Sequence, residues 1–391
     1  MDIEIKNQDG LGYVALKGSI SSANAQEFEK AIENLPGEGM GIILDAMQLN
    51  YISSAGLRVI LAAKKRCKGK TFQIINVSQS VMKIFEVTGF TQIMDIQAGL
   101  RHIEISGCSK IGAGACGECY RLDDETIIKL YYSKITKEEI EKEKELSKKA
   151  FVMGVPTAIS YDIVESEGRV GVIYELLNCK TLAEILREDT SEIEKYVKMY
   201  ADVCRQIHSI DGKDASLPSF KEINRKDIGN ITGITDEERN YLHRFLDLLP
   251  DSTHCVHGDL NPNNIMIQNG ECCLIDMGEF STGNPLFDVS RIVFSMRYAG
   301  EKGSDFNYFY KLPTKVVSHI LELFLKFYFE CDSMDEAIQK DSNAQWLEPL
   351  AWFRCATSML KGDNWGPVKR EEAMEILHNR LIPFIQSKDG K

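Results

Sequence analysis

The stretch VHGDLNPNNIM, residues 256–266, contains the polar residues that decide how the whole chain is interpreted. His257, Asp259 and Asn264 have the spacing H-x-D-x-x-x-x-N, and Asp276 follows in the apolar segment CLIDMG. In phosphoryl transfer, one carboxylate orients the acceptor hydroxyl and takes its proton, while an amide oxygen and a second carboxylate hold Mg²⁺ on the phosphates. We therefore predict Asp259 as the catalytic base and Asn264 and Asp276 as metal ligands. The alternative is a polar turn rich in Asn and Pro, but such a turn requires neither the preceding His-Gly-Asp nor the aspartate that follows.

The motifs HGDLNPNNIM and LIDMG together resemble the aminoglycoside phosphotransferase and choline kinase branch of the protein-kinase-like fold. Protein kinases usually have H-R-D and D-F-G at these places, whereas this chain has H-G-D and D-M-G. The resemblance extends over roughly residues 105–391. It implies a bilobal fold, ATP as the phosphate donor with GTP as the alternative, and Mg²⁺ as the cofactor. It also implies a small-molecule hydroxyl as the acceptor.

Upstream of these motifs lie the residues that a kinase-like fold uses to hold nucleotide phosphates. The segment GAGACG places Gly112, Gly114 and Gly117 in G-x-G-x-x-G spacing, which lets backbone amides approach phosphates, although a flexible hairpin turn would have the same pattern. Lys129 in TIIKLYY lies between apolar neighbours, where a lysine is costly unless it reaches solvent or a partner. An edge strand would also explain it. Its position 12 residues after the last glycine is that of the phosphate-binding lysine in the resembled family.

The helix expected after this strand, TKEEIEKEKELSKKA, should supply the anion that pairs with Lys129. Thr136 and Glu139 form a capping box at its start. At 100° per residue, Glu143 falls on the apolar face of the helix, while its other acidic residues point to solvent. We therefore predict Glu143 as the partner of Lys129.

The segment GVIYELLN, residues 171–178, resembles the connection between the two lobes. There, backbone groups from Glu175 to Leu177 would bind adenine, but any buried strand fits the pattern equally well. Asp288 in GNPLFDVSR resembles a late aspartate of the family that supports the catalytic loop. We interpret His208 as a packing residue.

Three tryptophans, Trp346, Trp352 and Trp365, lie in the carboxy-terminal region, where the resembled family builds its acceptor pocket. Aromatic rings can hold a cationic acceptor by cation–π contact, and the net acidity of the chain slightly favours such an acceptor. Helix core is nevertheless the favoured role for each ring.

The first hundred residues have a different pattern, in which strand and helix signals alternate. A strand that ends at Asp45, a short loop, YISSAGLRVIL and later VSQSVMKIFEVTGF together resemble a STAS domain, the module of anti-sigma factor antagonists. Their motif commonly reads D-S-S-G-L or D-S-T-G-L, and the first hydroxyl after the aspartate is phosphorylated. Alignment on Gly56 places Ser54 at that hydroxyl and Ser53 at the aspartate. A serine at the start of a helix is also a good N-cap, worth about 1 kcal/mol. We assign the cap to Ser53 and take Ser54 as the candidate phosphorylation site.

The composition, with 43% hydrophobic and 27% charged residues, is ordinary for a globular protein. The net charge is −12, and because residues 1–100 contain 10 basic and 10 acidic residues, the remainder carries the whole excess. This acidity argues against nonspecific binding of nucleic acid. No apolar run approaches the roughly 20 residues that cross a bilayer, and the amino terminus lacks the basic segment of a signal peptide. We expect a cytoplasmic protein without nucleic-acid or membrane partners, whose 11 cysteines are reduced.

The predicted fold is a two-domain combination of α/β and α+β. A STAS-like mixed sheet with helices is expected at residues 1–98 and a junction at 99–110. A kinase-like small lobe is expected at 111–178 and a large helical lobe at 179–391.

Three functions compete. The first is a small-molecule phosphotransferase whose STAS domain regulates it or docks a partner protein. The second is a signalling protein in which the kinase-like domain phosphorylates Ser54 or a partner protein. The third is an inactive nucleotide-binding scaffold, which the complete set of polar site residues makes the weakest.

Overall fold

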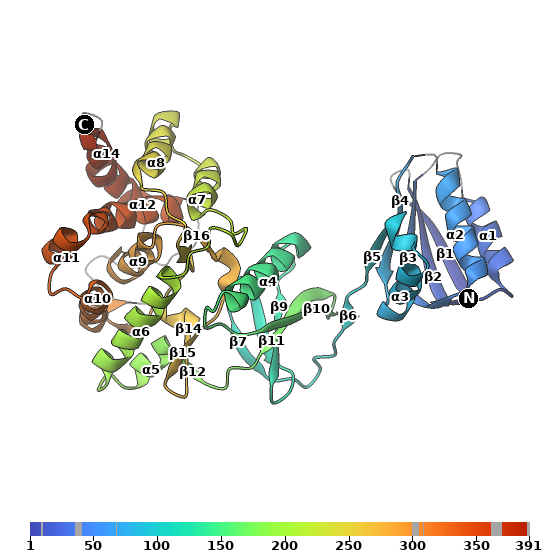
Figure 1. Ribbon diagram of the computed structural model, residues 1–391, viewed down its shortest axis with the longest axis horizontal. Coiled ribbons are helices and arrows are strands. Elements are labelled where there is room, and N and C mark those ends of the chain that lie inside the picture. The colour runs from blue at the N-terminus through green and yellow to red at the C-terminus, as the bar shows by residue number, and fades with distance from the viewer. Residues whose placement is uncertain are drawn as a thin grey trace. The chain divides into compact units, whose positions relative to one another are not determined.

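The computed structural model describes residues 1–8, 11–35, 41–67, 69–298, 305–307, 309–360 and 370–388. The chain forms two compact units (Figure 1), one of Met1–Ser106 with Ile163–Gly171 and one of Gly107–Asp162 with Val172–Lys391. The domain limits at residues 98, 110 and 178 stay predictions from the sequence. In the part of the chain that the structure describes, no helix is both long and apolar enough to span a membrane.

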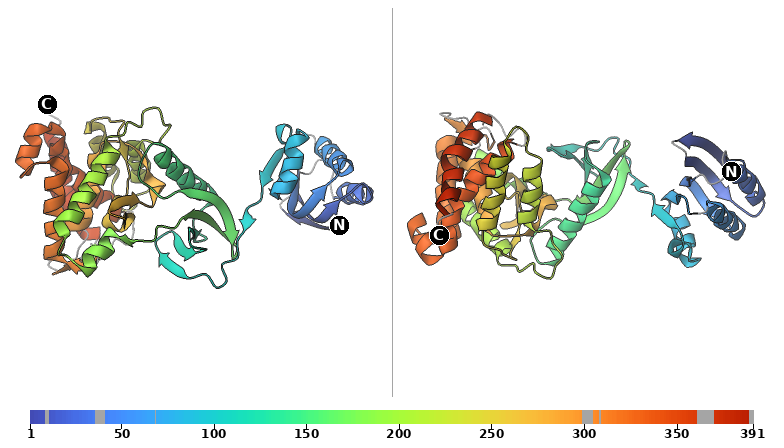
Figure 2. Two further views of the ribbon diagram at one scale, coloured as in Figure 1. Left: turned by 60° about the horizontal axis from the view of Figure 1, so that its bottom comes forward. Right: turned by 90° about the horizontal axis from the view of Figure 1, so that it is seen from above.

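The first unit contains a five-stranded mixed sheet in the order β1-β2-β3-β4-β5 and three helices on one face of that sheet (Figure 2). Their bounds are β1 (Asp2–Gln8), β2 (Leu11–Ile20), α1 (Ala25–Glu33), β3 (Gly41–Ile52), α2 (Ser54–Arg66), β4 (Phe72–Val77), α3 (Gln79–Val87), the 3-10 helix η1 (Phe90–Gln92) and β5 (Asp95–Ala98). Strand β1 is antiparallel to β2, and the other neighbouring pairs are parallel. Alternate strand residues such as Val14 and Leu44 form one core with Phe28 and Phe85 of the helices.

Strand β3 is longer than the sequence pattern predicts. We expected it to end at Asp45 and a loop to follow, but it continues to Ile52. The reason is its parallel partner β2, which pairs with it as far as Ile20 opposite Ile52, with two register shifts on the way. The predicted loop is therefore wrong, because pairing with a neighbouring strand overrides the local polar sequence.

The second sheet has six strands in the order β6-β10-β11-β9-β8-β7. Its strands and the adjacent helix are β6 (Arg101–His102), β7 (Lys110–Ala113), β8 (Gly117–Arg121), β9 (Thr126–Tyr131), α4 (Lys137–Val152), β10 (Ser160–Ser166) and β11 (Arg169–Glu175). The predicted capping box of Thr136 and Glu139 is present at the start of α4.

The rest of the second unit is mainly helical around one large hydrophobic core. Its helices are α5 (Leu182–Glu188), α6 (Ile193–His208), α7 (Phe220–Gly229), α8 (Asp236–Leu248), η2 (Pro262–Asn264), η3 (Met277–Glu279), α9 (Leu286–Val293), η4 (Phe294–Tyr298), α10 (Thr314–Phe329), α11 (Met334–Lys340), η5 (Ser342–Trp346), α12 (Leu347–Leu360), α13 (Arg370–Ile376), η6 (Leu377–Leu381) and α14 (Ile382–Lys388). Its strands are β12 (Lys180–Thr181), β13 (Cys255–Val256), β14 (Ile265–Gln268), β15 (Glu271–Leu274), β16 (Ser281–Thr282), β17 (Phe306–Asn307) and β18 (Leu312–Pro313).

The predicted fold class is confirmed. A mixed sheet with helices on one face forms the amino-terminal part, and a small sheet with one helix precedes a large helical lobe.

Candidate active site

The loop predicted to be catalytic, called the catalytic loop below, begins directly after the buried strand β13 and contains His257, Gly258 and Asp259. Gly258 has a φ of +89°, a conformation that side chains other than glycine rarely adopt. A Cβ at this position would lie 2.4 Å from the Cβ of Glu279. The chain therefore has H-G-D rather than H-R-D because Glu279 occupies the space that a side chain at residue 258 would need.

Asp288 of α9 accepts hydrogen bonds from the backbone of this loop. Its fully buried carboxylate accepts hydrogen bonds from the backbone N–H of His257 at 2.7 Å and of Gly258 at 2.8 Å. His208 Nε2 lies 3.1 Å from the same carboxylate, and its Nδ1 lies 2.8 Å from the hydroxyl of Tyr328. Burial opposes the charge of Asp288, but these hydrogen bonds and the neighbouring His residues lower its pKa below the ordinary value. Asp288 therefore supports the loop as predicted, and His208, which we expected only to pack, orients Asp288.

The carboxylate of Asp259 is held by two side chains. Arg291 donates to Oδ1 from Nε at 2.9 Å and from Nη2 at 2.7 Å. Asn264 Nδ2 donates to Oδ2 at 3.2 Å and to the carbonyl oxygen of Asp259 at 2.9 Å. The sequence interpretation missed Arg291. The available signal was an arginine inside the apolar helix segment LFDVSRIV, three residues after Asp288.

The predicted metal ligands lie on either side of the β14–β15 hairpin. The backbone carbonyl of Asn264 accepts from the N–H of Ile275, which brings Asp276 next to Asn264. Asp276 has a φ of +64° at the turn after β15, and its side chain is 47% exposed.

These residues fit Mg²⁺ by the chemistry of their donors. The amide nitrogen of Asn264 is used on Asp259, so its Oδ1 is the atom directed elsewhere, and Asp276 supplies a hard carboxylate oxygen. The described residues contain no cluster of three His, Cys, Asp or Glu side chains that could hold a metal. Magnesium does not need one, because it usually takes one or two protein ligands together with substrate phosphates.

Lys129 of β9 connects the small lobe to this loop. Its Nζ lies 2.7 Å from Glu143 Oε1 of α4 and 3.2 Å from Asp276 Oδ1. Burial favours the neutral amine, but the carboxylates of Asp276 and Glu143 outweigh it and raise the pKa of Lys129 above its ordinary value. The structure thus contains the predicted Lys129–Glu143 ion pair and adds Asp276 to it.

The three glycines of GAGACG differ in their surroundings. A Cβ at Gly112 of β7 or at Gly114 directly after it would meet nothing within 4 Å, so open space lies over this part of the β7–β8 hairpin. A Cβ at Gly117 would lie 2.5 Å from the carbonyl oxygen of Leu130. Gly117 is therefore required by packing against β9, whereas Gly112 and Gly114 leave room for a ligand such as a phosphate.

The predicted adenine-binding segment follows β11. The N–H of Glu175 donates to the carbonyl of Ile159, and the N–H of Leu176 donates to the carbonyl of Glu125. The carbonyl of Leu177 accepts from the N–H of Cys179. Two of the three N–H groups from Glu175 to Leu177 are thus used within the protein, which leaves the N–H of Leu177 as the candidate donor of this segment.

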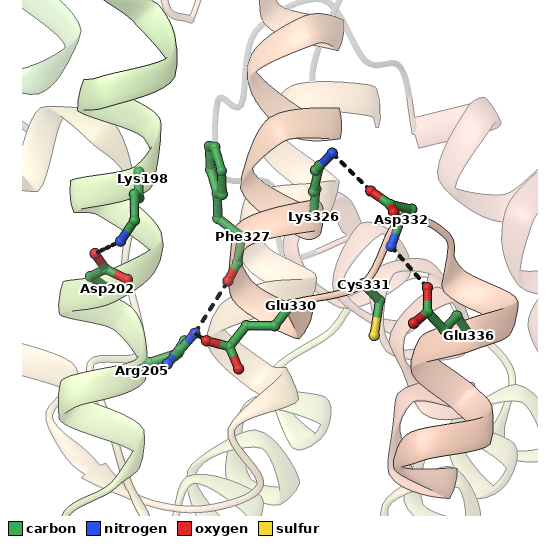
Figure 3. Close-up of a pocket in the computed structure, with 9 residues that line it drawn as sticks. All are labelled: Lys198, Asp202, Arg205, Lys326, Phe327, Glu330, Cys331, Asp332 and Glu336. Carbon is green, nitrogen blue, oxygen red and sulfur yellow. Dashed lines mark hydrogen bonds and ion pairs between the residues drawn. The ribbon is translucent and has the colours of Figure 1, made fainter.

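A separate groove of about 300 Å³ lies between α6 and the end of α10 (Figure 3). Its charged side chains pair with one another, as in Lys198–Asp202, Arg205–Glu330 and Lys326–Asp332. None of the predicted site residues lines this groove.

The tryptophans of the described region pack against the core. Trp346 and Trp352 are partly buried on the large hydrophobic cluster, where both rings contact Phe384. Trp365 lies outside the described residues.

The start of α2 distinguishes the two serines of the first unit. Ser53 is the N-cap, and its side chain accepts a hydrogen bond from the N–H of Gly56 at 3.4 Å. Ser54 is the first residue of the helix and is exposed. The cap prediction for Ser53 is confirmed, and the phosphorylation of Ser54 stays a prediction.

Comparison with protein families places the second unit. The model described as "Phosphotransferase enzyme family" matches residues 108–308, which is just over half of the chain. The chain belongs to this phosphotransferase family. The STAS domain model matches residues 2–103, so the phosphotransferase carries an amino-terminal STAS domain.

Curated relatives match the STAS domain. One is BtrV of Bordetella bronchiseptica, a candidate anti-sigma factor antagonist, which is 31% identical over 99 residues, 25% of this chain and 85% of the relative. The anti-sigma-B factor antagonist of Bacillus subtilis is 24% identical over 100 residues, 25% of this chain and 92% of the relative.

Solved structures similar to the chain include ADP-bound aminoglycoside phosphotransferase APH(2'')-Ib, with 14% identity and a TM-score of 0.45 over 70% of this chain and 91% of the other. Another is the amicoumacin kinase hAmiN with AMP-PNP, Ca²⁺ and Ami, with 14% identity and a TM-score of 0.46 over 78% of this chain and 93% of the other.

Proposed function

We propose that the protein is an ATP- and Mg²⁺-dependent phosphotransferase that moves the γ-phosphate to a hydroxyl group of a small molecule, with GTP as the alternative donor. The observation that carries this proposal is the contact of Lys129 with both Glu143 and Asp276. It brings together residues of β9, α4 and the turn after β15. Strand β9 also pairs with β8, which pairs with β7 in the glycine-rich hairpin. Such convergence of a lysine and carboxylates is what phosphate transfer requires.

In this proposal different residues bind the nucleotide, hold the metal and accept the proton. Lys129 and the backbone at Gly112 and Gly114 would hold the phosphates, and the N–H of Leu177 would bind adenine. Asn264 Oδ1 and Asp276 would hold Mg²⁺, which neutralises charge on the phosphates when it is bound. Asp259 would orient the acceptor hydroxyl and take its proton as the new P–O bond forms.

The test uses the purified 391-residue chain with ATP or GTP, Mg²⁺ and a panel of acceptors, followed by mass detection of phosphorylated products. The panel contains aminoglycosides, choline-like alcohols and neutral sugars, because the acidity of the chain favours a cationic acceptor without excluding others. We expect Asp259→Asn to abolish transfer. The matched control is Asp251→Asn, which removes an exposed carboxylate paired with Lys221. A wild-type protein that neither binds Mg²⁺–nucleotide nor turns over any acceptor would contradict the proposal.

For the STAS domain we propose a role in regulation or in docking a partner protein. A second candidate function is phosphorylation of Ser54 by the phosphotransferase domain, within the chain or between copies. It is supported by the exposure of Ser54 and by the cap that Ser53 provides, which leaves the Ser54 hydroxyl out of the capping bond. Phosphate on Ser54 would also meet the positive end of the α2 dipole.

Intact mass measured after incubation with Mg²⁺–ATP tests this second function. Autophosphorylation predicts the mass of one added phosphate on the wild type and none on Ser54→Ala or Asp259→Asn. An unchanged wild-type mass, in a preparation that phosphorylates a small acceptor, would leave only the first function.

A further inference from the structure

Arg291 of α9 places a guanidinium directly on the proposed catalytic base. Two of its nitrogens donate to the same oxygen of Asp259, Nε at 2.9 Å and Nη2 at 2.7 Å from Oδ1. The side chain of Arg291 is only 5% exposed, whereas that of Asp259 is 31% exposed. The arginine therefore approaches the carboxylate from the protein interior and leaves its outer side open to an acceptor.

The two oxygens of Asp259 are consequently different. A carboxylate oxygen has about two lone-pair sites, so two N–H donors from Arg291 occupy Oδ1. Oδ2 receives a single hydrogen bond, from Asn264 Nδ2 at 3.2 Å, and keeps one site. Oδ2 is thus the atom that can accept the proton of an incoming hydroxyl.

Arg291 differs from the second buried arginine near the loop. Arg354 of α12 donates from Nη2 to the carbonyl oxygen of Gly258 at 2.9 Å and packs 4.7 Å from the ring centre of Phe220. Arg354 therefore supports the main chain of the loop, whereas Arg291 contacts the reacting side chain itself. The fixed fork of a guanidinium also sets direction in a way that a lysine amine cannot.

We propose that Arg291 is a positioning residue for phosphoryl transfer, which fixes the Asp259 carboxylate so that Oδ2 faces the acceptor hydroxyl. The inference rests on the proposed function. In the step, the acceptor oxygen forms a bond to the γ-phosphorus and the bond from that phosphorus to the bridging oxygen of the nucleotide breaks. The hydroxyl proton moves to Asp259 Oδ2, and the nucleoside diphosphate leaves. Arg291 keeps its proton throughout.

The test compares Arg291→Ala and Arg291→Lys with the wild type. We expect kcat for Arg291→Ala to fall by about 100-fold, the cost of a misplaced catalytic group. The KM for ATP and the nucleotide-induced shift in melting temperature should stay close to those of the wild type, because the two hydrogen bonds from Arg291 to Asp259 orient the base and not the nucleotide. Added ethylguanidinium should restore part of kcat in Arg291→Ala. The kcat of Arg291→Lys should lie between those of the wild type and Arg291→Ala.

The matched control is Arg205→Gln. Arg205 also pairs with a carboxylate and a backbone carbonyl, Glu330 and Phe327, but it does so in the groove of Figure 3. Its kcat should equal that of the wild type.

Two results would overturn the role of Arg291. One is an Arg291→Ala variant with wild-type kcat. The other is a parallel loss of kcat and nucleotide binding in both variants without rescue by ethylguanidinium, which would show a structural role only. A wild type without any turnover would contradict both the proposed function and this inference. An active wild type with an equally active Arg291→Ala variant would contradict only the inference.

Discussion

The catalytic loop and the start of α2 each carry a residue proposed for phosphate chemistry, but the fold holds them in different ways. Asp259 and its neighbours are held by buried charged side chains of α9 and α12, which come much later in the chain. Ser54 is exposed, and its helix start depends on a cap from the adjacent residue. Substitutions of the buried α9 and α12 residues that contact the loop should therefore change stability and turnover strongly. Substitutions at the start of α2 should have local effects.

The largest effect is expected for Asp288→Asn. Loss of one partner from a buried charged network typically costs about 3–5 kcal/mol of unfolding free energy, and the amide cannot accept all the hydrogen bonds that the carboxylate accepts. Intrinsic tryptophan fluorescence during denaturation measures the effect in this lobe, since all three tryptophans lie at residues 346–365. Unchanged stability would show that the loop is held in another way.

The difference in unfolding free energy between the wild type and Asp288→Asn should depend on pH. Because the pKa of Asp288 is lowered on folding, its contribution is complete above the ordinary carboxyl range and disappears as the pH falls through the lowered value. The difference in stability between wild type and Asp288→Asn should therefore shrink in acid. A difference that grows in acid would contradict the assignment.

The next effect compares two glycines. Gly258→Ala forces a Cβ against Glu279 at a φ of +89°, strain of about 1–3 kcal/mol, and should greatly reduce turnover. Gly112→Ala meets nothing within 4 Å and should keep the melting temperature of the wild type. Melting temperature and kcat of both variants test this contrast, and equal losses of stability would break it.

Lys129→Met is expected to change nucleotide affinity rather than stability. Loss of a charged hydrogen-bonding group costs about 1.5–3 kcal/mol, so nucleotide affinity should fall about 10- to 100-fold. Lys142→Met, an exposed neighbour of Glu143 on α4, is the control. Calorimetric titration with a nonhydrolysable ATP analogue measures both, and equal affinities would remove Lys129 from the nucleotide site.

The smallest effect separates the serines. Ser53→Ala should destabilise α2 by about 1 kcal/mol because the N-cap is lost, whereas Ser54→Ala should change stability little. Hydrogen exchange of the α2 amides, followed by mass spectrometry, reports on this helix directly. Faster exchange in Ser54→Ala than in Ser53→Ala would reverse the assignment of the cap.

Local patterns predicted much of the site. The face of α4 on which Glu143 lies follows from helical periodicity, which explains why its pairing with Lys129 could be expected. The end of β3 could not be expected, because it depends on where β2 continues to pair. Arg291 was missed because an arginine in an apolar helix segment does not reveal whether it turns inward or reaches solvent.

The sequence by itself determined the order of the functional groups, from the glycine-rich turn through Lys129 and Glu143 to Asp259, Asn264 and Asp276, together with the change of pattern near residue 100. Only the tertiary structure decided which distant side chains contact these functional groups. Asp276 meets Lys129 across 147 residues, and Arg291 meets Asp259 across 32. Such contacts depend on how helices and strands pack, which the local spacing of residues does not specify. The physical reason is that a buried charge is tolerated only where packing brings it a partner.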